Sequence, residues 1–298
     1  MHKRNVLSSP RLAELKKQRR NAVVRKFLIL LFAVAVLFTT GTYLSKVEGL
    51  NISSVEISGN KVVETNLIKT SVEEQITGKY IWLFPKTNVL FYPKGTIKAT
   101  LQKNFSRLGK IDLSVRDRKI LVVSVSEREA LYMWCGEIPP IETLRLEENK
   151  CYFLDNEGYI FDEAPFFSGE VYFKFYGALD NNAAENPIGS YFSGKNFKQL
   201  VLFKDVVSGM GTDPVMISVL PDGDIEMFLA RNDSNTAGPK IIFESEADLE
   251  KVAENLQAAL ATEPLLSGFK NKYSSLLYID LRFGNKVYFK FLPASGGQ

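Results

Sequence analysis

Side chains that commonly carry out catalysis or bind metals are scarce in this sequence. The single histidine, His2, lies next to the amino terminus, and the two cysteines are Cys135 and Cys151. A serine or cysteine nucleophile usually depends on a nearby histidine as its base, and zinc sites combine several His and Cys ligands. Because no histidine follows residue 2, the rest of the chain offers neither a Ser-His pair nor a Cys-His pair. Two cysteines alone are too few for a zinc site.

Two other catalytic designs use residues that the chain does contain. Paired carboxylates can hydrolyse glycosides, and acidic residues gather at 127–130, 147–150 and 155–163. Solvated turn residues at strand ends are the simpler interpretation of these clusters. A Ser-Lys hydrolase is formally possible, but no spacing selects a pair, and no phosphate-binding glycine motif occurs. We therefore expect a protein that is not an enzyme and that holds no cofactor and no metal.

The cysteines and tryptophans fit structural roles better. Cys135 ends the apolar run ALYMWC and Cys151 begins CYFLD, so the two could face each other across a long hairpin and form a disulfide. Two free, buried thiols are the alternative, because sequence spacing does not establish disulfide geometry. Trp82 and Trp134 are expected in the core, although either could instead anchor a partner.

A membrane anchor is predicted close to the amino terminus. Residues 27–44, FLILLFAVAVLFTTGTYL, carry no charge, and as a helix they would extend about 27 Å, close to the hydrocarbon thickness of a bilayer. Residues 1–26 hold nine Lys or Arg and one acid, a net charge of +8, so the remainder carries 3 − 8 = −5. The positive-inside rule then keeps the basic tail at 1–26 in the cytoplasm, with the span at 27–45 and the rest outside. Because the basicity is confined to this tail, we expect no nucleic-acid partner.

Two alternatives to an uncleaved anchor are open. A secretory signal peptide has a shorter apolar region of about 7–15 residues, followed by a small-x-small cleavage site. Here the apolar run is longer, and SKVEGLN follows it without such a site. A buried helix of a soluble protein is the other alternative.

The part beyond the span is predicted to be α+β, beginning with a small domain at 50–129. Apolar residues alternate in its predicted strands and recur every fourth residue in its predicted helices. The elements in chain order are a strand at 52–60, helices at 64–78 and about 93–105, and strands at 110–115 and 119–127. The order strand, helix, helix, strand, strand places two helices on one face of a small sheet, with Asp117-Arg118 as the tight link between the last two strands.

Residues 130–292 are predicted to form a β-rich domain with two helices. Short apolar runs separated by turn signals such as Asp222-Gly223 indicate strands, and one helix is expected around 194–208. For the second helix, Ser245 is the expected cap, with Asp248 at capping-box spacing. Residues 293–298 are expected to be a flexible tail.

The stretch YIDLRFGNKVYFKF at 278–291 predicts a terminal β-hairpin that turns at Gly284-Asn285. Strict alternation separates two faces in each strand. One face holds Ile279, Leu281, Phe283, Val287, Phe289 and Phe291; the other holds Tyr278, Asp280, Arg282, Lys286, Tyr288 and Lys290. We expect the apolar set to face the core and the polar set to face solvent.

The order of these features resembles that of the FtsQ/DivIB family of cell-division proteins, from the tail to about residue 292. VEISGN at 55–60 resembles the first strand and turn of the family's POTRA module, and LSVRDRKILVVSVSEREALYMW at 113–134 is similar to its strand-turn-strand pattern leading into E-R-x-P-x-A-x-W. FLDNEGYIF at 153–161 is similar to the family hairpin written with Asp, two variable residues, Gly and an aromatic, and YIDLR at 278–282 resembles the family's late D-L-R strand. The chain departs from the family at Ala130, where Pro is common, in the turn at 116–118, which lacks Trp-Pro, and in its cysteine pair.

Such a resemblance implies a non-catalytic scaffold of the division septum, anchored in the cell membrane by one helix and carrying a POTRA-like β-α-α-β-β domain. The implied partners are FtsB-like and FtsL-like single-span proteins and other members of the divisome. In the family, FtsB adds a strand to an exposed sheet edge near the carboxyl terminus, so that main-chain hydrogen bonds supply affinity. Carried over by position, the implied partner-binding residues are Tyr278, Asp280, Arg282, Lys286, Val287, Tyr288, Phe289 and Lys290.

Other interpretations of the edge and of the whole chain are open. Proline cannot donate to a ladder, so Tyr288→Pro is expected to block strand addition while the domain stays folded. Lys286 and Lys290 could instead only protect an edge against aggregation. The chain could also be another POTRA-bearing adaptor for envelope assembly or secretion, which should show tandem modules or a following barrel. An anchored cell-wall hydrolase, detectable on a peptidoglycan zymogram, is the third function class.

Overall fold

The computed structural model describes residues 10–140, 150–167, 171–180, 185–193, 196–230 and 238–293. His2, the acidic cluster at 147–149 and the predicted flexible tail beyond Pro293 lie outside these residues. The chain divides into two compact units. The first contains the chain up to Asn104 together with Lys110–Ser126, and the second contains Phe105–Gly109 together with the chain from Glu127 onward. The last point of division along the chain, between Ser126 and Glu127, falls three residues before the predicted domain boundary at 129/130.

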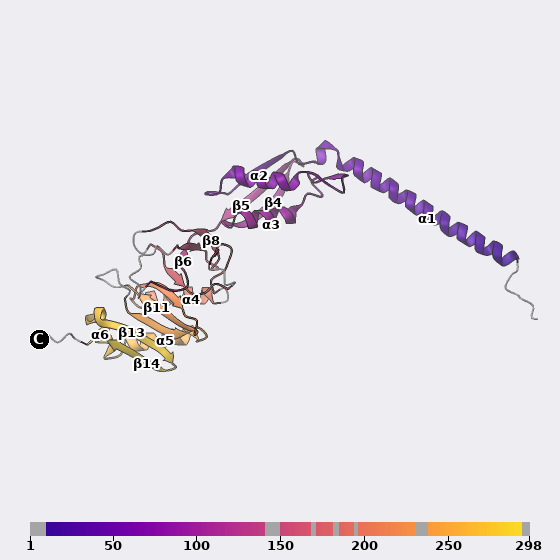
Figure 1. Ribbon diagram of the computed structural model, residues 1–298. Coiled ribbons are helices and arrows are strands. Elements are labelled where there is room, and N and C mark those ends of the chain that lie inside the picture. Colours follow the sequence, from indigo (N-terminus) through magenta and orange to yellow (C-terminus); the bar gives the residue numbers. More distant parts are fainter. Residues whose placement is uncertain are drawn as a thin grey trace, which may run out of the picture. The chain divides into compact units, whose positions relative to one another are not determined.

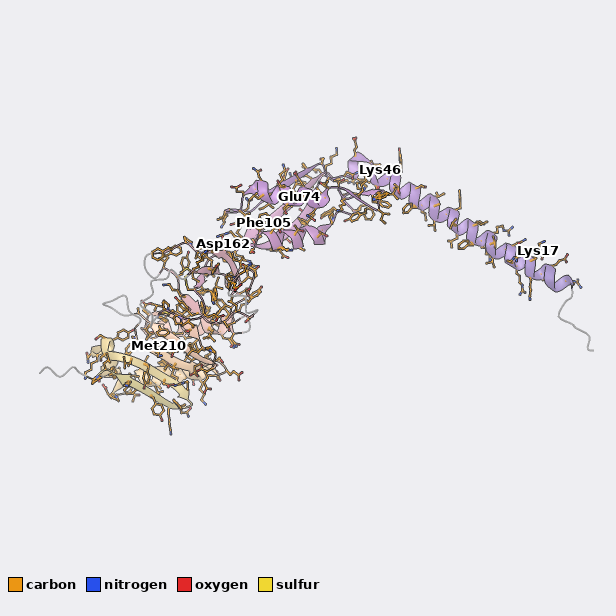
Figure 2. All side chains as sticks on the ribbon, viewed as in Figure 1. Lys17, Lys46, Glu74, Phe105, Asp162 and Met210 are labelled. Atoms are coloured by element: carbon orange, nitrogen blue, oxygen red, sulfur yellow. A yellow bond between two sulfur atoms is a disulfide. The ribbon has the colours of Figure 1, made fainter. Side chains whose placement is uncertain are left out.

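The first unit begins with one long helix, α1 (Pro10–Ser45), drawn in indigo in Figure 1. Helix was predicted only from residue 27, but it continues through the basic segment, since residues 11–26 are mostly good helix formers. Figure 2 places Lys17 and Lys46 toward the two ends of this element. By length and composition α1 can cross a membrane, and none of its most apolar window is buried against the rest of the protein.

A small α/β domain follows α1 in the predicted order of elements (Figure 1). Its main elements are β1 (Ser54–Ser58), α2 (Thr65–Ile76), α3 (Lys94–Asn104), β4 (Leu108–Arg116) and β5 (Ile120–Glu127). The strands lie in the order β1-β5-β4, with β1 parallel to β5. The inward faces of the helices are fully buried through Ile68, Val72, Ile97 and Leu101. Asp117 and Arg118 have φ of 52° and 57°, as the predicted tight link between β4 and β5 requires.

The domain also contains a hairpin that the sequence did not reveal. It lies between α2 and α3 and consists of β2 (Lys79–Tyr80) and β3 (Phe84–Pro85), joined by Ile81, Trp82 and Leu83. The side chain of Trp82 at its tip is 91% exposed, so the prediction of a buried Trp82 is wrong. The prediction rested on the general tendency of aromatic residues to be buried, and the strands of this hairpin are too short to show a period.

The second unit is built on one nine-stranded sheet in the order β14-β13-β12-β11-β10-β9-β6-β7-β8. These strands are β6 (Tyr132–Trp134), β7 (Tyr152–Leu154), β8 (Ile160–Glu163), β9 (Lys174–Tyr176), β10 (Pro214–Val219), β11 (Asp224–Leu229), β12 (Lys240–Glu244), β13 (Leu276–Phe283) and β14 (Lys286–Phe291). The helices are α4 (Phe197–Gly209), α5 (Leu249–Leu260) and α6 (Leu265–Asn271). The prediction of two helices missed α6, because seven residues are too few to show a helical period.

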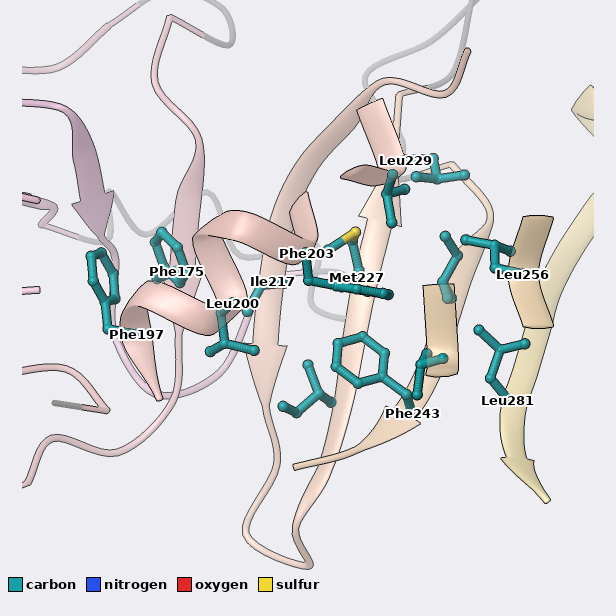
Figure 3. Packing of buried hydrophobic residues seen from close by; sticks show 14 of the residues in the cluster. Phe175, Phe197, Leu200, Phe203, Ile217, Met227, Leu229, Phe243, Leu256 and Leu281 are labelled. Carbon is teal, nitrogen blue, oxygen red and sulfur yellow. The ribbon is translucent and has the colours of Figure 1, made fainter. Parts of the chain in front are cut away.

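The main core of this unit lies between the helices and one face of the sheet. Figure 3 shows Phe203 of α4 beside Met227 and Phe243 of the sheet, and the rings of Phe203 and Phe243 are 4.7 Å apart. In the half of the sheet formed by β6 to β9, the opposite face is also covered, by a second cluster that contains Met133 and Cys135. Trp134 points into the main core instead, as period-2 alternation requires, and its indole Nε1 donates to the Gly177 carbonyl.

Helix α5 begins differently from the prediction. Its N-cap is Asp248, whose carboxylate accepts a hydrogen bond from the Glu250 N–H at 3.1 Å. Ser245 was the predicted cap, but it lies three residues earlier, where its own N–H donates to the Gly223 carbonyl next to the β10–β11 turn. The pairing of β12 with β11 therefore holds Ser245 at the sheet and leaves the cap to Asp248.

Gly59, directly after β1, allows the close approach of β1 to β5 in the small domain to be tested. Its φ is +90°, and a Cβ there would lie 2.1 Å from the Val125 carbonyl oxygen on β5. Gly78 has a similar φ of +93° but nothing within 4 Å of such a Cβ. We expect Gly78→Ala to cost about 1–2 kcal/mol of unfolding free energy from backbone strain alone. Gly59→Ala should cost about 1–3 kcal/mol more, because the overlap forces β1 away from β5.

The measurement is hydrogen exchange of the β1 and β5 peptides in the full-length protein in detergent micelles. Both variants should exchange faster than the wild type, with Gly59→Ala clearly the faster. Equal exchange in the two alanine variants would contradict the close approach of β1 to β5 at this glycine.

Candidate functional site

The carboxyl-terminal hairpin forms one end of the nine-stranded sheet, as labelled in Figure 1. Strands β13 and β14 are joined by the two residues Gly284 and Asn285, with Phe283 opposite Lys286 and a Gly284 φ of +64°. This confirms the predicted hairpin and its turn. Within the described residues, β14 pairs with β13 on one side and has no strand on its other side. The candidate site is this outer side of β14, which we call the β14 edge.

The side chains of β14 alternate between the core and solvent. Val287, Phe289 and Phe291 are half-buried and pack against the main core, whereas Lys286, Tyr288 and Lys290 are exposed. The predicted faces of β14 are therefore confirmed. Helix α6 reaches this end of the sheet at Gly268, where an added Cβ would lie only 2.5 Å from the Phe291 ring. The core side of the edge is thus supported by α6 and the main core.

The backbone N–H and C=O groups of β14 also alternate in direction, and this alternation decides which of them point toward β13 and which point away from it. Leu292, directly after the strand, donates its N–H to the Ser275 carbonyl at the start of β13. Successive backbone groups of a strand point to opposite sides, and both register irregularities of this pair insert the extra residue in β13, so β14 itself is regular. The backbone N–H and C=O groups of Lys286, Tyr288 and Lys290 therefore point toward β13. The backbone groups of Val287, Phe289 and Phe291 point outward, at the β14 edge.

This geometry corrects the expectation for Tyr288→Pro. The Tyr288 N–H points inward to the existing ladder, where Tyr288 lies opposite Asp280. Proline there would disrupt the pairing of β14 with β13 and would not act on the open edge alone. Sequence alternation assigned the side-chain faces of β14 correctly, but it could not say which residues of this strand donate their backbone N–H to which side.

Asp280 and Arg282 were expected on the exposed face. Both lie on the face opposite the main core, as alternation predicts, but Asp280 is only 6% exposed and Arg282 is partly covered, so the expected exposure is wrong. They are covered because β13 lies between β12 and β14 and because the two side chains pair with each other. The guanidinium of Arg282 donates to both carboxylate oxygens of Asp280, Nη2 to Oδ2 at 2.6 Å and Nε to Oδ1 at 2.9 Å. Its Nη1 donates to Asp224 on β11, two strands away. Asp-Leu-Arg is therefore an ion-pair cluster within the sheet.

The electrostatics of this cluster favour its charged state. Burial on its own would raise the pKa of Asp280, but the hydrogen bonds and positive charge of Arg282 outweigh burial, and the pKa of Asp280 lies below its ordinary value of 3.8. The hydrogen bonds from Arg282 to Asp280 and to Asp224 raise the pKa of the guanidinium further above its usual range. Asp280 and Arg282 are therefore both ionised at neutral pH, and their charges are directed at each other and away from a partner.

Tyr278 and Phe283 of β13 also differ from their predicted positions. Tyr278 is half-buried in β13, opposite Lys240 on β12 and Lys290 on β14, so it is not at the edge. Phe283 was expected in the core, yet it is about half-exposed, because the register shift between Asp280 and Phe283 breaks the alternation of β13. Its ring lies 5.1 Å from that of Tyr288, edge to face. Sequence alternation did not predict this exposed aromatic pair next to the turn.

The other end of the sheet differs from the β14 edge. Strand β8 is four residues long, and its outer side is partly covered by the segment at 189–191. The Ile160 N–H donates to the Ser190 carbonyl, and the Ile160 carbonyl accepts from the Gly189 N–H. Tyr159 forms a further bridge with Tyr191. The six-residue β14 is therefore the longer and less protected edge.

Two further sequence expectations concern the β6–β8 end of the sheet. Cys135 and Cys151 form a disulfide that closes a sequence separation of 16 residues. In the chain-entropy picture, a loop of this length stabilises the fold by about 3 kcal/mol. Arg128, from the segment that resembles E-R-x-P-x-A-x-W, pairs with Asp155 at the start of the Asp-Asn-Glu-Gly turn and lies 4.0 Å from the Tyr159 ring centroid. Two of the four family-like segments are thus in direct contact.

The described residues contain no group of three or more His, Cys, Asp or Glu side chains placed to hold a metal ion. The acids of the turn at 155–163 have protein partners, since Asp162 accepts from Arg107 at 2.6 Å and Glu163 pairs with Lys150. These pairs account for the acidic cluster by ordinary ion pairing.

The Asp280–Arg282–Asp224 cluster predicts a pH-dependent contribution to stability. Asp280→Asn removes the buried charge and should lower the unfolding free energy at neutral pH by about 2 kcal/mol. Because the folded pKa of Asp280 is depressed, this stabilisation is complete above the ordinary pKa of 3.8 and is lost as the pH falls toward the folded value. The difference between wild type and variant should therefore shrink below about pH 4.

Denaturant unfolding of the full chain in micelles measures this, with the fluorescence of buried Trp134 as reporter in a Trp82→Phe background. Glu163→Gln is the matched control, because Glu163 and Lys150 are both largely exposed and such pairs contribute about 0–1 kcal/mol. A loss for Asp280→Asn no larger than that for Glu163→Gln would contradict a structural role for the cluster.

Compared with known proteins, the chain matches no model of a protein family and no curated protein.

Proposed function

We propose that this chain is a non-catalytic scaffold of the bacterial divisome. It is anchored by α1 with its amino terminus in the cytoplasm and its bulk outside, at the division septum. It holds FtsB-like and FtsL-like single-span partners, and one of them adds a strand to the β14 edge. The observation that carries the proposal is the six-residue β14 edge, whose outward backbone groups have no ladder partner among the described residues.

The edge has the properties that strand addition needs. Val287, Phe289 and Phe291 present their backbone N–H and C=O groups outward at every second residue, and a partner strand would pair with these groups. The same three side chains pack against the main core, so the edge is held rigidly before a partner arrives. A preformed edge lowers the entropy cost of binding.

The side chains of the edge suggest what the partner strand looks like. Lys286 and Lys290 lie on the exposed face with Tyr288 between them, and Phe283 stands beside Tyr288. A complementary strand would carry acidic or aromatic side chains on this face and apolar side chains on the face that continues the core. The charges would favour the correct partner and register more than they would add affinity.

Two features of the rest of the chain support a membrane scaffold. Helix α1 is long and apolar enough to cross a bilayer, and nine Lys or Arg precede its uncharged stretch. The small domain after it has the β-α-α-β-β order of a POTRA-like module, with the hairpin β2–β3 added between its helices. A domain of this kind next to the membrane would provide a second surface for other divisome members.

Protection of the edge against aggregation is the competing explanation for Lys286 and Lys290. A proline substitution distinguishes edge protection from strand addition by a partner. Val287→Pro removes an outward N–H, whereas Val287→Ala removes the same side chain and keeps the N–H. We expect Val287→Pro to lower recovery of the FtsB-like partner at least about tenfold, because each lost ladder bond and the poor fit of proline weaken strand addition. Val287→Ala should retain most of the recovery.

The measurement is a pulldown of the tagged full-length protein from solubilised membranes, with partners identified by mass spectrometry. Equal thermal unfolding midpoints of the two variants would show that both are folded. Undiminished partner recovery with Val287→Pro would exclude strand addition at the β14 edge. Recovery lost equally in both variants would point to side-chain packing and would likewise contradict a backbone-mediated contact.

A further inference from the structure

The hairpin β2–β3 presents an exposed apolar tip that its own domain does not use. The side chains of Ile81 and Trp82 are 80% and 91% exposed, and Leu90 in the following loop is 73% exposed. Phe91 beside it is also exposed, and Tyr80, Phe84 and Phe91 line an apolar hollow at the base of the hairpin. Large apolar side chains gathered in this way mark a contact with another protein or with lipid.

The backbone of the tip makes this exposure more informative. Ile81 and Trp82 both have left-handed φ, 47° and 63°, and the Leu83 N–H closes the turn on the Tyr80 carbonyl at 3.0 Å. Turns with two left-handed residues strongly favour Asn and Gly, and a β-branched residue there is a genuine outlier. The sequence thus accepts backbone strain at the tip and places two large apolar side chains where small polar ones fit best. Such strain points to a function at the tip.

The hairpin is attached to the outer end of α1. The Phe84 ring on β3 lies 5.7 Å from the ring of Phe38 on α1, edge to face. Asn88, which is fully buried, donates from Nδ2 to the Ser45 carbonyl at the end of α1, at 3.1 Å. Asn51 donates to the same carbonyl at 3.0 Å. Two side-chain amides therefore fix the last turn of α1 to the domain.

The depth of Phe38 along α1 follows from the helical rise. Arg25 and Lys26 mark the cytoplasmic limit of the uncharged segment, and a bilayer core of about 30 Å needs about 20 helical residues, which reaches residue 46. Phe38 lies six residues before the end of the uncharged segment at Leu44, or about 9 Å inside it. Its side chain leans further toward the amino terminus, as helical side chains do. A ring that contacts Phe38 is therefore at the level of the membrane.

Charge around the hairpin fits a lipid surface as well. Residues 75–104 contain five lysines and no Asp or Glu. Two of them lie at the base of the hairpin, Lys79 as the first residue of β2 and Lys86 directly after β3. The Lys86 ammonium lies 5.9 Å from the centroid of the Tyr80 ring. Tryptophan and tyrosine concentrate at membrane–water interfaces, and lysine can extend from there to lipid headgroups.

We propose that the β2–β3 tip enters the outer leaflet of the same bilayer that α1 spans, with Ile81 and Trp82 among the upper acyl chains and Lys79 and Lys86 at anionic headgroups. This inference rests on the membrane span of the proposed function and not on partner capture. The tip and α1 form two attachments to one membrane, which would hold the small domain close to the lipid surface. A protein partner could instead cover the tip. We favour lipid because Phe38 belongs to the proposed span, and the hairpin that contacts it through Phe84 would lie at the same depth.

Quenching by brominated lipid tests the proposal on the full-length protein. The chain has only two tryptophans, and the other, Trp134, is buried in the second unit. The protein is reconstituted into vesicles of phosphatidylethanolamine and phosphatidylglycerol, with and without bromine on the upper part of the acyl chains. We expect brominated lipid to lower the wild-type emission assigned to Trp82 about twofold, because the indole lies among the chains. Trp82→Phe, which keeps only Trp134, should show no quenching.

Leu37→Trp in the Trp82→Phe background reports whether α1 itself is in the bilayer. Quenching of this probe together with quenching of Trp82 supports the inference. Quenching of the probe while Trp82 is accessible to aqueous acrylamide and not to brominated lipid overturns the inference alone and leaves the tip to a protein. An unquenched Leu37→Trp probe overturns the membrane span and the inference with it. Failure of partner recovery in the pulldown would affect only the β14 edge.

Discussion

An open β-sheet leaves unpaired backbone groups at each of its two ends, and much of this protein can be understood from how the ends are treated. At β8 the strand is short, and the segment at 189–191 satisfies part of its outer ladder. Strand β14 is regular over six residues, and α6 supports its core side at the Phe291 ring. Its outer side has no strand among the described residues. The asymmetry of these two ends is the structural basis for proposing partner capture at β14.

The Asp-Leu-Arg sequence of β13 contributes to this edge indirectly. Arg282 joins Asp280 to Asp224 on β11 and so connects the terminal hairpin to the interior of the sheet. The register shift that accompanies this cluster turns Phe283 outward beside Tyr288. Asp280 and Arg282 are therefore positioning residues for the hairpin, and the exposed aromatic pair is the part that a partner could reach.

Helix α1 imposes a second constraint, on the first unit. In the proposed membrane span, the uncharged segment of α1 is barely as long as a bilayer core is thick, so anything packed against its outer third would lie at membrane level. The contact between Phe38 and Phe84 would then bring a hairpin with two strained apolar residues to that level. The proposed lipid contact and the proposed strand capture lie in different units and depend on different residues, so each can be correct without the other.

Local patterns in the sequence were sufficient to predict the apolar helix, the strand-helix-helix-strand-strand order, the terminal hairpin with its Gly-Asn turn and the faces of β14. Each of these depends on the spacing of apolar residues or on turn residues that are close in the chain. The buried position of Asp280, the exposure of Phe283 and the outward direction of the Val287 N–H depend instead on which strands flank β13 and where its register shifts. The exposed Trp82 tip was missed because the strands of its hairpin are too short to show a period. The place of this hairpin beside α1 depends on the contact of Phe84 with Phe38, about 45 residues earlier in the chain. Only the tertiary structure brings such distant segments together, so only it decides what an exposed side chain or an open strand can touch.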